Sequence, residues 1–319
     1  MKRAILILCV LCLMISGNAL AEYTTDTTPR PIPVIEDNEI TPTPAGMHHY
    51  MLICNDQWPT DPDNITHTDG LILLSVDEIA GRVMLTSFIR DMLIQRPDGK
   101  FGRINNVCLY FGADRTGIEH LTHTISTHFD VEIDKYLVVD FGQVEKIVDA
   151  IGGVDITITG REATYLKNYR ISPSSTTPAI EGSGTYHFSG HAAVIYMRIR
   201  KVPTISGALQ DVGRTERART VLTSIADSLK DISYDDAMKL LDVVLENTVM
   251  TNMSAAECVE AVSIAMELRG VPVEGIRMPI DGTYELLPVA GMATQQIDFE
   301  ANRKALRDFL YGNSFAVIE

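Results

Sequence analysis

The order of apolar and polar residues predicts strands and helices in alternation. Short apolar or alternating runs predict strands, and runs with apolar positions three and four apart predict helices. Strands are expected over 50–54, 71–76, 82–89, 136–139 and 154–159, with a short turn near Gly81. Helices are expected over 116–129 and 141–151, the second ended by Gly152 and Gly153. This alternation predicts an α/β domain whose sheet is covered by helices.

The second half of the chain is mainly helical. Helices are predicted over 191–197, 212–229, 235–245 and 298–311, and a capping box from Ser254 to Glu257 opens another that reaches Leu268. Short strands are expected near Ile276 and Tyr284, and residues 171–184 form a Ser/Thr/Gly loop. Since composition does not change after Met47 and no repeat is visible, one domain is expected.

The N-terminus has the features of an export signal. Lys2 and Arg3 precede an uncharged apolar run, and small residues at positions 19 and 21 fit a cleavage site. The run is about half of the roughly 20 residues that a spanning helix needs. Residues 1–21 are therefore expected to be a signal peptide or, as the alternative, an uncleaved signal anchor. Either reading places the protein outside the cytoplasm, at the cell wall or the outer face of the membrane.

A segment rich in threonine and proline follows the leader. Residues 22–46 contain five prolines within 29–44, which predicts an extended, poorly packed linker. The folded domain is expected over 47–319. Removing the leader leaves 25 basic and 42 acidic residues, so the net charge falls from −15 to −17. Binding to nucleic acid is not expected, because affinity for that backbone comes from clustered cations.

Three cysteines lie beyond the leader, at Cys54, Cys108 and Cys258. An odd number excludes a fully paired disulfide framework. A bridge between Cys54 and Cys108, or three buried free thiols, both remain open.

Arginines stand at the ends of predicted elements in an otherwise acidic chain. Arg90 ends a strand, Arg198 and Arg200 end a helix, and Arg214 and Arg217 are three apart on another. A planar guanidinium grips two phosphate oxygens at once, so a group of them suits a diphosphate. Any one of these arginines taken alone is better explained as a surface cation or a salt bridge to one of the many carboxylates.

Two aspartates flank the turn between the first two strands. Asp56 follows one strand and Asp69 precedes the next. If these strands are neighbours, both carboxylates lie at one edge of the sheet, and with phosphate oxygens they suit magnesium. The alternative is that both are turn-forming residues.

The combined order of short motifs resembles the LytR-CpsA-Psr family. The resemblance extends from Tyr50 to about Leu229 and is carried by N-D at 55–56, T-D-G at 68–70, S-F-I-R-D at 87–91, R-I-N at 103–105, V-D-A-I-G-G-V at 148–154, Y-M-R-I-R at 196–200 and D-V-G-R-x-x-R at 211–217.

This resemblance implies a single α/β domain with a mixed central sheet, helices on both faces and a hydrophobic lipid pocket. It implies transfer of a phosphorylated glycan, of the teichoic acid or capsular type, from an undecaprenyl diphosphate carrier to peptidoglycan. The partners would be the lipid-linked glycan, peptidoglycan and the outer membrane surface. The stretches 71–74 and 144–151 are candidates for lining the pocket, although apolar residues at such spacing also form plain core.

Residue roles follow from the same resemblance. Asp56 and Asp69 would hold Mg²⁺. Diphosphate binding would fall to Arg90, Arg103, Asn105, Arg198, Arg200, Arg214 and Arg217. Arg90, Asp211 and Arg214 would be catalytic, with Asp211 either orienting an arginine or acting as a base.

The chain departs from the family pattern at three positions. His67 stands where an arginine is frequent, Ile89 where a proline is usual, and Ala218 where a glutamine is frequent. These changes thin the polar lining and leave two other functions open. One is a binder of lipid-linked glycan or peptidoglycan without catalysis, and the other is a polyprenyl diphosphate hydrolase.

Overall fold

The computed structural model describes residues 29–56, 61–168, 180–289 and 291–312. The expected leader, residues 1–21, and most of the loop expected over 171–184 lie outside these residues. Among the described residues, none of the helices combines the length and the apolar character that a membrane crossing requires.

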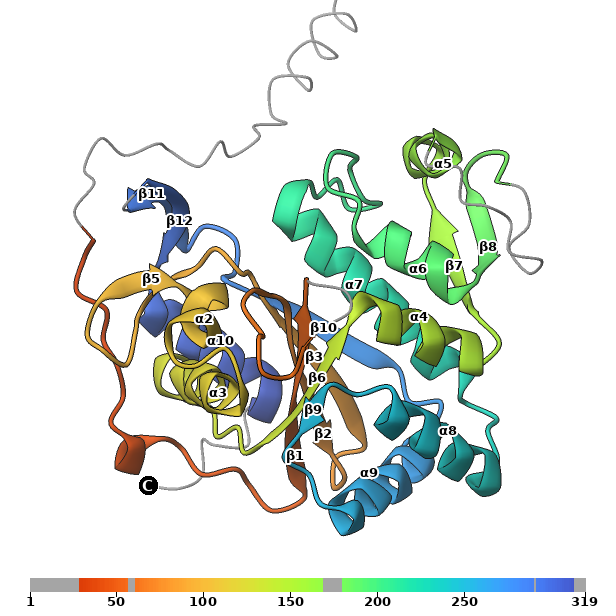
Figure 1. Ribbon diagram of the computed structural model, residues 1–319, viewed down its shortest axis with the longest axis horizontal. Coiled ribbons are helices and arrows are strands. Elements are labelled where there is room, and N and C mark those ends of the chain that lie inside the picture. Colours follow the sequence, from red (N-terminus) through yellow and green to blue (C-terminus); the bar gives the residue numbers. More distant parts are fainter. Residues whose placement is uncertain (1–28, 57–60, 169–179, 290, 313–319) are drawn as a thin grey trace, which may run out of the picture.

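A six-stranded mixed sheet forms the centre of the fold (Figure 1). Its order is β10-β3-β2-β1-β6-β9. These strands span Val273–Met278, Arg82–Phe88, Thr68–Asp77, Met47–Asn55, Lys135–Asp140 and Met250–Thr251, in that order. The β1–β2, β2–β3 and β6–β9 pairs are antiparallel, and the β1–β6 and β3–β10 pairs are parallel. The predicted mixed α/β architecture is confirmed.

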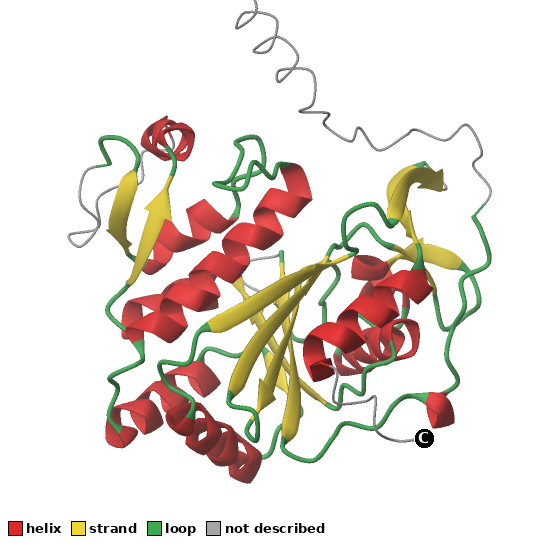
Figure 2. Ribbon diagram, turned by 180° about the vertical axis from the view of Figure 1, so that it is seen from behind, coloured by secondary structure: helices red, strands yellow, loops and turns green. Residues whose placement is uncertain are grey.

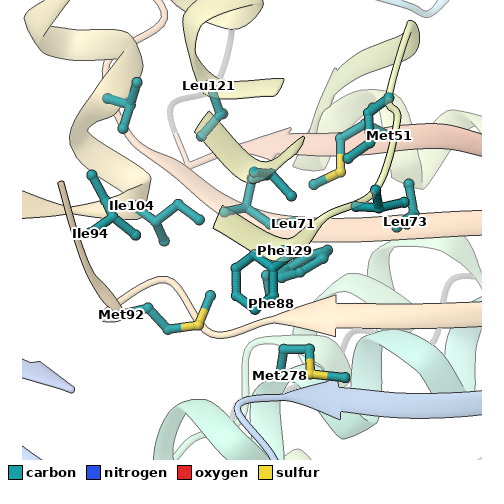
Figure 3. Packing of buried hydrophobic residues seen from close by; sticks show 14 of the residues in the cluster. Met51, Leu71, Leu73, Phe88, Met92, Ile94, Ile104, Leu121, Phe129 and Met278 are labelled. Carbon is teal, nitrogen blue, oxygen red and sulfur yellow. The ribbon is translucent and has the colours of Figure 1, made fainter. Parts of the chain in front are cut away.

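One face of the sheet packs against α2 (Val107–Tyr110), α3 (Arg115–Phe129) and α10 (Phe299–Tyr311). This interface is the main core (Figure 3), in which Met51, Leu71, Leu73, Phe88 and Phe129 are almost fully buried. The Phe88 and Phe129 rings meet edge to face at 4.9 Å, an arrangement that the ring quadrupole favours.

The other face is covered by α7 (Gln210–Ser228), α8 (Tyr234–Glu246) and α9 (Ala255–Glu267) (Figure 2). Helix α9 begins with the predicted capping box, in which Ser254 and Glu257 cap each other's backbone. Beside α7, a second apolar cluster joins α4 (Phe141–Ala150), α5 (Gly160–Asn168) and α6 (Gly190–Met197) to the antiparallel pair of β7 (Val154–Ile158) and β8 (Gly184–Phe188).

Two short hairpins and two 3₁₀ helices complete the described part of the fold. Strands β4 (Leu93–Gln95) and β5 (Phe101–Arg103) form one hairpin, and β11 (Tyr284–Val289) and β12 (Met292–Ile297) form another. The 3₁₀ helices are η1 (Asp37–Glu39) and η2 (Ile104–Asn106). Most of these pieces have no sequence signal beyond their turns, because each contains only a few residues.

The described part of the expected linker lies on the domain. Ile32 is buried in the main core, and the Ile35 amide donates to the Thr127 carbonyl at 3.0 Å. The Asp130 carboxylate accepts the amide of Thr41 at 2.8 Å. The description of this stretch as poorly packed is therefore wrong from about residue 30 onward, since its polar backbone groups find partners on α3.

The three cysteines are free thiols. Cys108 and Cys258 are buried and Cys54 is partly exposed. Of the two alternatives left open by the sequence, the structure supports unpaired cysteines.

Candidate active site

The functional side chains meet at one end of the central sheet. Strand β1 ends at Asn55, which pairs with Thr68 at the start of β2, and the Asp56 amide donates to the His67 carbonyl at 3.1 Å. The strands before and after the turn are thus neighbours, as the candidate metal site required. Asp56 directly follows β1 and Asp69 is the second residue of β2, so both lie at this edge of the sheet.

Asp69 is the centre of a group of charges. Its carboxylate, 8% exposed as a residue, accepts from Arg90, from Nη1 of Arg214 at 2.9 Å and from the Asn105 side chain at 3.1 Å. These partners come from the end of β3, from α7 and from η2. The sequence predicted all four as site residues, and folding brings them into direct contact.

Asp211 is a second centre. It lies in the first turn of α7, and its carboxylate is 2.9 Å from Arg200 and 3.0 Å from Arg214, with Arg90 at 3.5 Å. Although burial opposes ionisation, the guanidiniums of Arg214, Arg90 and Arg200 hold the pKa of Asp211 below its ordinary value. This geometry favours the role of orienting arginines over that of a base.

Asp91 extends the network and was not among the predicted site residues. Its carboxylate is 3.3 Å from Arg103 and 3.7 Å from Arg90. Burial and the charge of Asp211 raise its pKa. The sequence offered one sign of its role, because Asp91 directly follows Arg90 in the S-F-I-R-D motif. Arg103 also donates to the Ala293 carbonyl at 2.9 Å, which joins the site to β12.

Arg198 stands apart from this network. It is the exposed C-terminal cap of α6, and its guanidinium lies 4.9 Å from the centre of the Phe141 ring, the first residue of α4. A cation over an aromatic face keeps its charge available for a ligand.

Arg217 does not reach the cluster, which corrects its expected role in phosphate binding. Its side chain is fully buried and pairs with the equally buried Glu162 at 2.8 Å. It also donates to the carbonyls of Ile199 at 2.8 Å and Val202 at 2.7 Å. A guanidinium without exposed surface cannot meet a substrate, so Arg217 instead fixes the loop that carries Arg198 and Arg200.

Asp56 and Asp69 fit a magnesium ion that completes its coordination with other oxygens. The Asp56 side chain reaches the surface but is partly desolvated. This partial desolvation and the charge of Asp69 raise the pKa of Asp56, so a cation between the two carboxylates would relieve their repulsion. No group of three or more metal-binding side chains exists among the described residues. The ion would therefore depend on water and phosphate oxygens, as magnesium commonly does.

An apolar cavity of about 470 Å³ lies between the sheet and helices α7, α8 and α9. Its volume is within the range of small-molecule sites, about 300–1,000 Å³. Helix α8 contains no fully buried residue, because Leu240, Leu241, Val244 and Leu245 face this space rather than packed core. The walls on the sheet side include Leu52, Leu74 and Leu85.

Most of the residues proposed to line such a pocket do not. Of the stretch 71–74 only Leu74 borders the cavity, since Leu71 and Leu73 point to the opposite face and belong to the main core. Residues 144–151 do not border it either, because they pack against α6 in the second cluster. Alternation along the strand, not apolarity alone, decides which face a residue joins.

Helix α7 connects the charges to the cavity. Its first turns carry Asp211 and Arg214, and its later turns place Leu222, Ile225 and Leu229 on the cavity wall. At about 1.5 Å per residue, Arg214 and Leu222 are roughly 12 Å apart along the axis. One helix therefore contributes both to the cluster of arginines and aspartates and to the wall of the apolar cavity.

None of the three departures from the family pattern takes part in the hydrogen bonds and ion pairs of the Asp69 and Asp211 side chains among the described residues. His67 is exposed, and the Ile89 amide donates to the Met278 carbonyl at 2.9 Å. Ala218 packs partly against the second apolar cluster.

Comparison with known proteins agrees with the motifs. The model of the LytR_cpsA_psr family matches residues 35–307. The chain belongs to this family. The transferase TagV of Bacillus subtilis, described as a polyisoprenyl-teichoic acid–peptidoglycan teichoic acid transferase, is 23% identical over 193 residues, which is 60% of this chain and 46% of TagV.

Other proteins similar to this chain show comparable sequence identity. The regulatory protein MsrR of Staphylococcus aureus (strain COL) is 24% identical over 251 residues, covering 77% of this chain and 69% of MsrR. The chain thus spans about half the length of TagV and about two thirds of MsrR. The crystal structure of B. subtilis TagV superposes with a TM-score of 0.62 at 20% identity, covering 84% of this chain and 98% of that one. A structure of TagT bound to LIIa-WTA gives 0.65 at 19% identity, with 86% and 95% covered. These likenesses show the fold.

Proposed function

We propose that the protein transfers a phosphorylated glycan from a polyprenyl diphosphate carrier to peptidoglycan outside the cytoplasm. The observation that carries the proposal is that α7 carries Arg214, which meets Arg90 at Asp69, in its first turns and lines an apolar cavity with its later turns. A lipid-linked anion has one charged end and one apolar end, and the two halves of the site match them. The names of TagV and of TagT bound to LIIa-WTA support teichoic acid as the type of glycan.

The arginines would hold the diphosphate while the cavity holds the chain of the carrier. Arg90, Arg200 and Arg214 are held in place by Asp69 and Asp211, so little rearrangement is needed when the substrate arrives. Arg198, exposed above Phe141, would take an outer phosphate oxygen. Asn105 would add a neutral donor beside Asp69.

The reaction would be an in-line displacement at phosphorus. An acceptor hydroxyl oxygen forms a bond to the glycan-side phosphorus, and the bond from that phosphorus to the bridging oxygen breaks. The leaving group is the polyprenyl phosphate, and the hydroxyl proton passes to water. Mg²⁺ held by Asp56 and Asp69 would supply charge neutralisation at the phosphate oxygens when bound. The arginines stabilise the charge that grows on the leaving phosphate.

Two other functions would use the same site. A hydrolase would place water where the acceptor hydroxyl stands, and a binding protein would hold the lipid-linked glycan without breaking it. The histidine in place of an arginine at His67 favours these alternatives, whereas the intact contacts of Asp69 with Arg90, Asn105 and Arg214 favour transfer.

A transfer assay separates the three functions. The full chain would be incubated with a labelled polyprenyl diphosphate–glycan, Mg²⁺ and a peptidoglycan fragment, beside Arg214→Gln and the control Arg161→Gln, an exposed arginine on α5. Label joined to peptidoglycan, lost in Arg214→Gln and kept in the control, is the expected result. Free glycan phosphate irrespective of the acceptor would indicate hydrolysis, and binding without any product would indicate the binding protein.

A further inference from the structure

Asp91 is a partly buried carboxylate at the charged site for which the reaction described so far has no use. It follows Arg90 just beyond the end of β3, and its side chain is 19% exposed. Its backbone is held in place, because the Asp91 carbonyl accepts the Gln295 amide at 2.9 Å and the next residue, Met92, forms a β-bridge with Gln295. The Asp91 side chain therefore extends from a fixed backbone beside the arginines proposed to meet the substrate.

The charged groups that face Asp91 come from three places in the fold. Nη1 of Arg103 on β5 lies 3.3 Å from its Oδ1, and Nε of Arg90 lies 3.7 Å from the same oxygen. The carboxylate of Asp211 on α7 is near enough to hydrogen-bond to Asp91 when one of the two holds a proton. Burial and the charge of Asp211 raise the pKa of Asp91, whereas the arginines around Asp211 outweigh its burial and lower its pKa. The first proton that this pair takes up therefore goes to Asp91.

Two polar atoms at this point are buried without a hydrogen-bond partner among the described residues. They are Nε of Arg90 and Oδ1 of Asp91, which are 3.7 Å apart and thus beyond normal hydrogen-bond length. Both side chains still reach the surface, with exposed fractions of 17% and 19%. Buried polar groups are normally hydrogen-bonded. A hydroxyl that arrives from solvent, accepts from Arg90 and donates to Asp91 would satisfy both atoms.

Arg90 also sets the position of Asp91 relative to Asp69. Its Nη1 donates to Asp69, while its Nε faces Asp91. Because the guanidinium is rigid and planar, the two carboxylates stand at two nitrogens of one group. A phosphate bound by Arg90 and Arg214 would therefore be a close neighbour of a hydroxyl at Asp91, as an attack on phosphorus requires.

We propose that Asp91 is the catalytic base of the transfer and takes the proton of the acceptor hydroxyl. The proposal rests on the proposed function and assigns its proton step. Asp211 is less suited to this task, since Arg200 and Arg214 lie 2.9 Å and 3.0 Å from its carboxylate and occupy it. Within the described part of the chain, Asp91 has no ion pair shorter than 3.3 Å.

The proton step balances without any further reactant. The acceptor O–H bond breaks and its proton joins Asp91, while the oxygen forms a bond to the glycan-side phosphorus. The bond from that phosphorus to the bridging oxygen breaks, and its electron pair leaves with the polyprenyl phosphate. Asp91 then passes the proton to water, where the overall reaction leaves it. Base catalysis of this kind usually contributes about 100- to 10,000-fold in rate.

The test is steady-state transfer by the full chain at saturating Mg²⁺, with a labelled polyprenyl diphosphate–glycan and a peptidoglycan fragment. Wild type would be compared with Asp91→Asn, Asp91→Glu and the exposed control Asp231→Asn. We expect Asp91→Asn to lower kcat at least about 100-fold and to leave the affinity for farnesyl diphosphate within about threefold of wild type. Asp91→Glu should keep part of the rate, because it retains a carboxylate, and the control should match wild type.

The pH dependence of kcat gives a readout that a structural role would not change. A base acts only when ionised, so kcat of wild type should fall on acidification. The fall should begin above the ordinary aspartate pKa of about 4, because the pKa of Asp91 is raised. It should be present in Asp91→Glu and absent from Asp91→Asn. Saturating Mg²⁺ prevents protonation of Asp56 from producing the same fall.

Each contrary result has a distinct meaning. If wild type joins no glycan to the peptidoglycan fragment, the proposed function fails together with this step. If wild type is active and Asp91→Asn, with an unchanged melting temperature, keeps kcat within about threefold, only the role of Asp91 is overturned. A parallel loss of kcat and of farnesyl diphosphate affinity would make Asp91 a positioning residue for Arg90 and Arg103, not a base. Should Asp91→Asn fail to fold, a kcat of wild type that does not fall on acidification would contradict the proposal.

Discussion

Nη1 of Arg214 lies 2.9 Å from Oδ2 of Asp69, although the two residues are 145 positions apart in the chain. This pair joins α7 to the edge of the central sheet, and Arg90 from β3 meets the same oxygen. Neither arginine is free to move away from the carboxylate without leaving a buried charge.

Replacing Asp69 should therefore cause a large loss of transfer activity, not a small one. In Asp69→Asn, the side chain no longer neutralises Arg90 and Arg214 and loses one oxygen for a cation. We expect kcat/KM for transfer to fall about 100-fold, which corresponds to roughly 2.7 kcal/mol of transition-state stabilisation. Steady-state kinetics with the lipid-linked substrate measure this. Activity within threefold of wild type would show that Asp69 is only a turn residue.

Arg217 and Glu162 give the contrasting case of a structural pair. Both side chains are fully buried, so Arg217→Met leaves the Glu162 charge unpaired. Breaking such a pair costs about 3–5 kcal/mol of the free energy of unfolding, whereas a double Arg217→Met, Glu162→Met variant should recover part of it. Urea denaturation followed by circular dichroism measures both, with Arg161→Gln as control. A single variant as stable as wild type would contradict the assignment.

Asp56 predicts a pH dependence for magnesium binding. Burial and Asp69 raise its pKa above the ordinary value of about 4, so its carboxylate gains a proton earlier on acidification than a free aspartate. We expect Mg²⁺ affinity, measured by calorimetry with farnesyl diphosphate bound, to decline from a pH above that value. Asp56→Asn should bind Mg²⁺ at least about tenfold more weakly, the loss expected for 1.4 kcal/mol of ligand free energy. Unchanged affinity in this variant would remove Asp56 from the metal site.

The buried His49, which lies outside the charged site, should make the folded protein less stable at acidic pH. It is buried against Ser75 and Tyr311, and burial lowers its pKa from 6.5 to about 4. Since the folded state holds the neutral ring, its contribution is present above pH 6.5 and is lost as the pH falls toward 4. A pKa shift of this size corresponds to about 3 kcal/mol of the free energy of unfolding. The free energy of unfolding of His49→Gln should therefore depend less steeply on pH over this interval, while the exposed His191→Gln should follow wild type. Parallel curves for His49→Gln and wild type would contradict the role.

The strands and helices of the central sheet were predictable because their apolar periods are long and regular. The predicted strand over 82–89 and the helix over 212–229 match β3 and α7 to within two residues at each end. The small β4–β5 and β11–β12 hairpins were not fully predictable, since strands of three to six residues leave little pattern. The packing of residues 30–43 was also not predicted, because the contacts of an irregular, proline-rich segment leave no periodic pattern in the sequence.

The charged site was predictable in its members and not in its geometry. Motif order brought Asp69, Arg90 and Arg214 into one group, and the structure places them in contact. Helical spacing also put Arg217 on the same list, yet three residues along a helix turn a side chain by about 60° from its neighbour. That rotation sends Arg217 into the core.

The central claim is that the charge cluster and the apolar cavity act as one site. Its most direct test is the affinity of polyprenyl diphosphates of increasing chain length for wild type and for Ala226→Trp, which places an indole in the cavity, beside the control Asp227→Trp on the exposed side of α7. We predict that affinity rises with chain length in wild type and in the control, and that Ala226→Trp loses this rise while it still binds the shortest head group. If Ala226→Trp gains affinity with chain length as wild type does, the lipid does not enter the cavity and the claim is wrong.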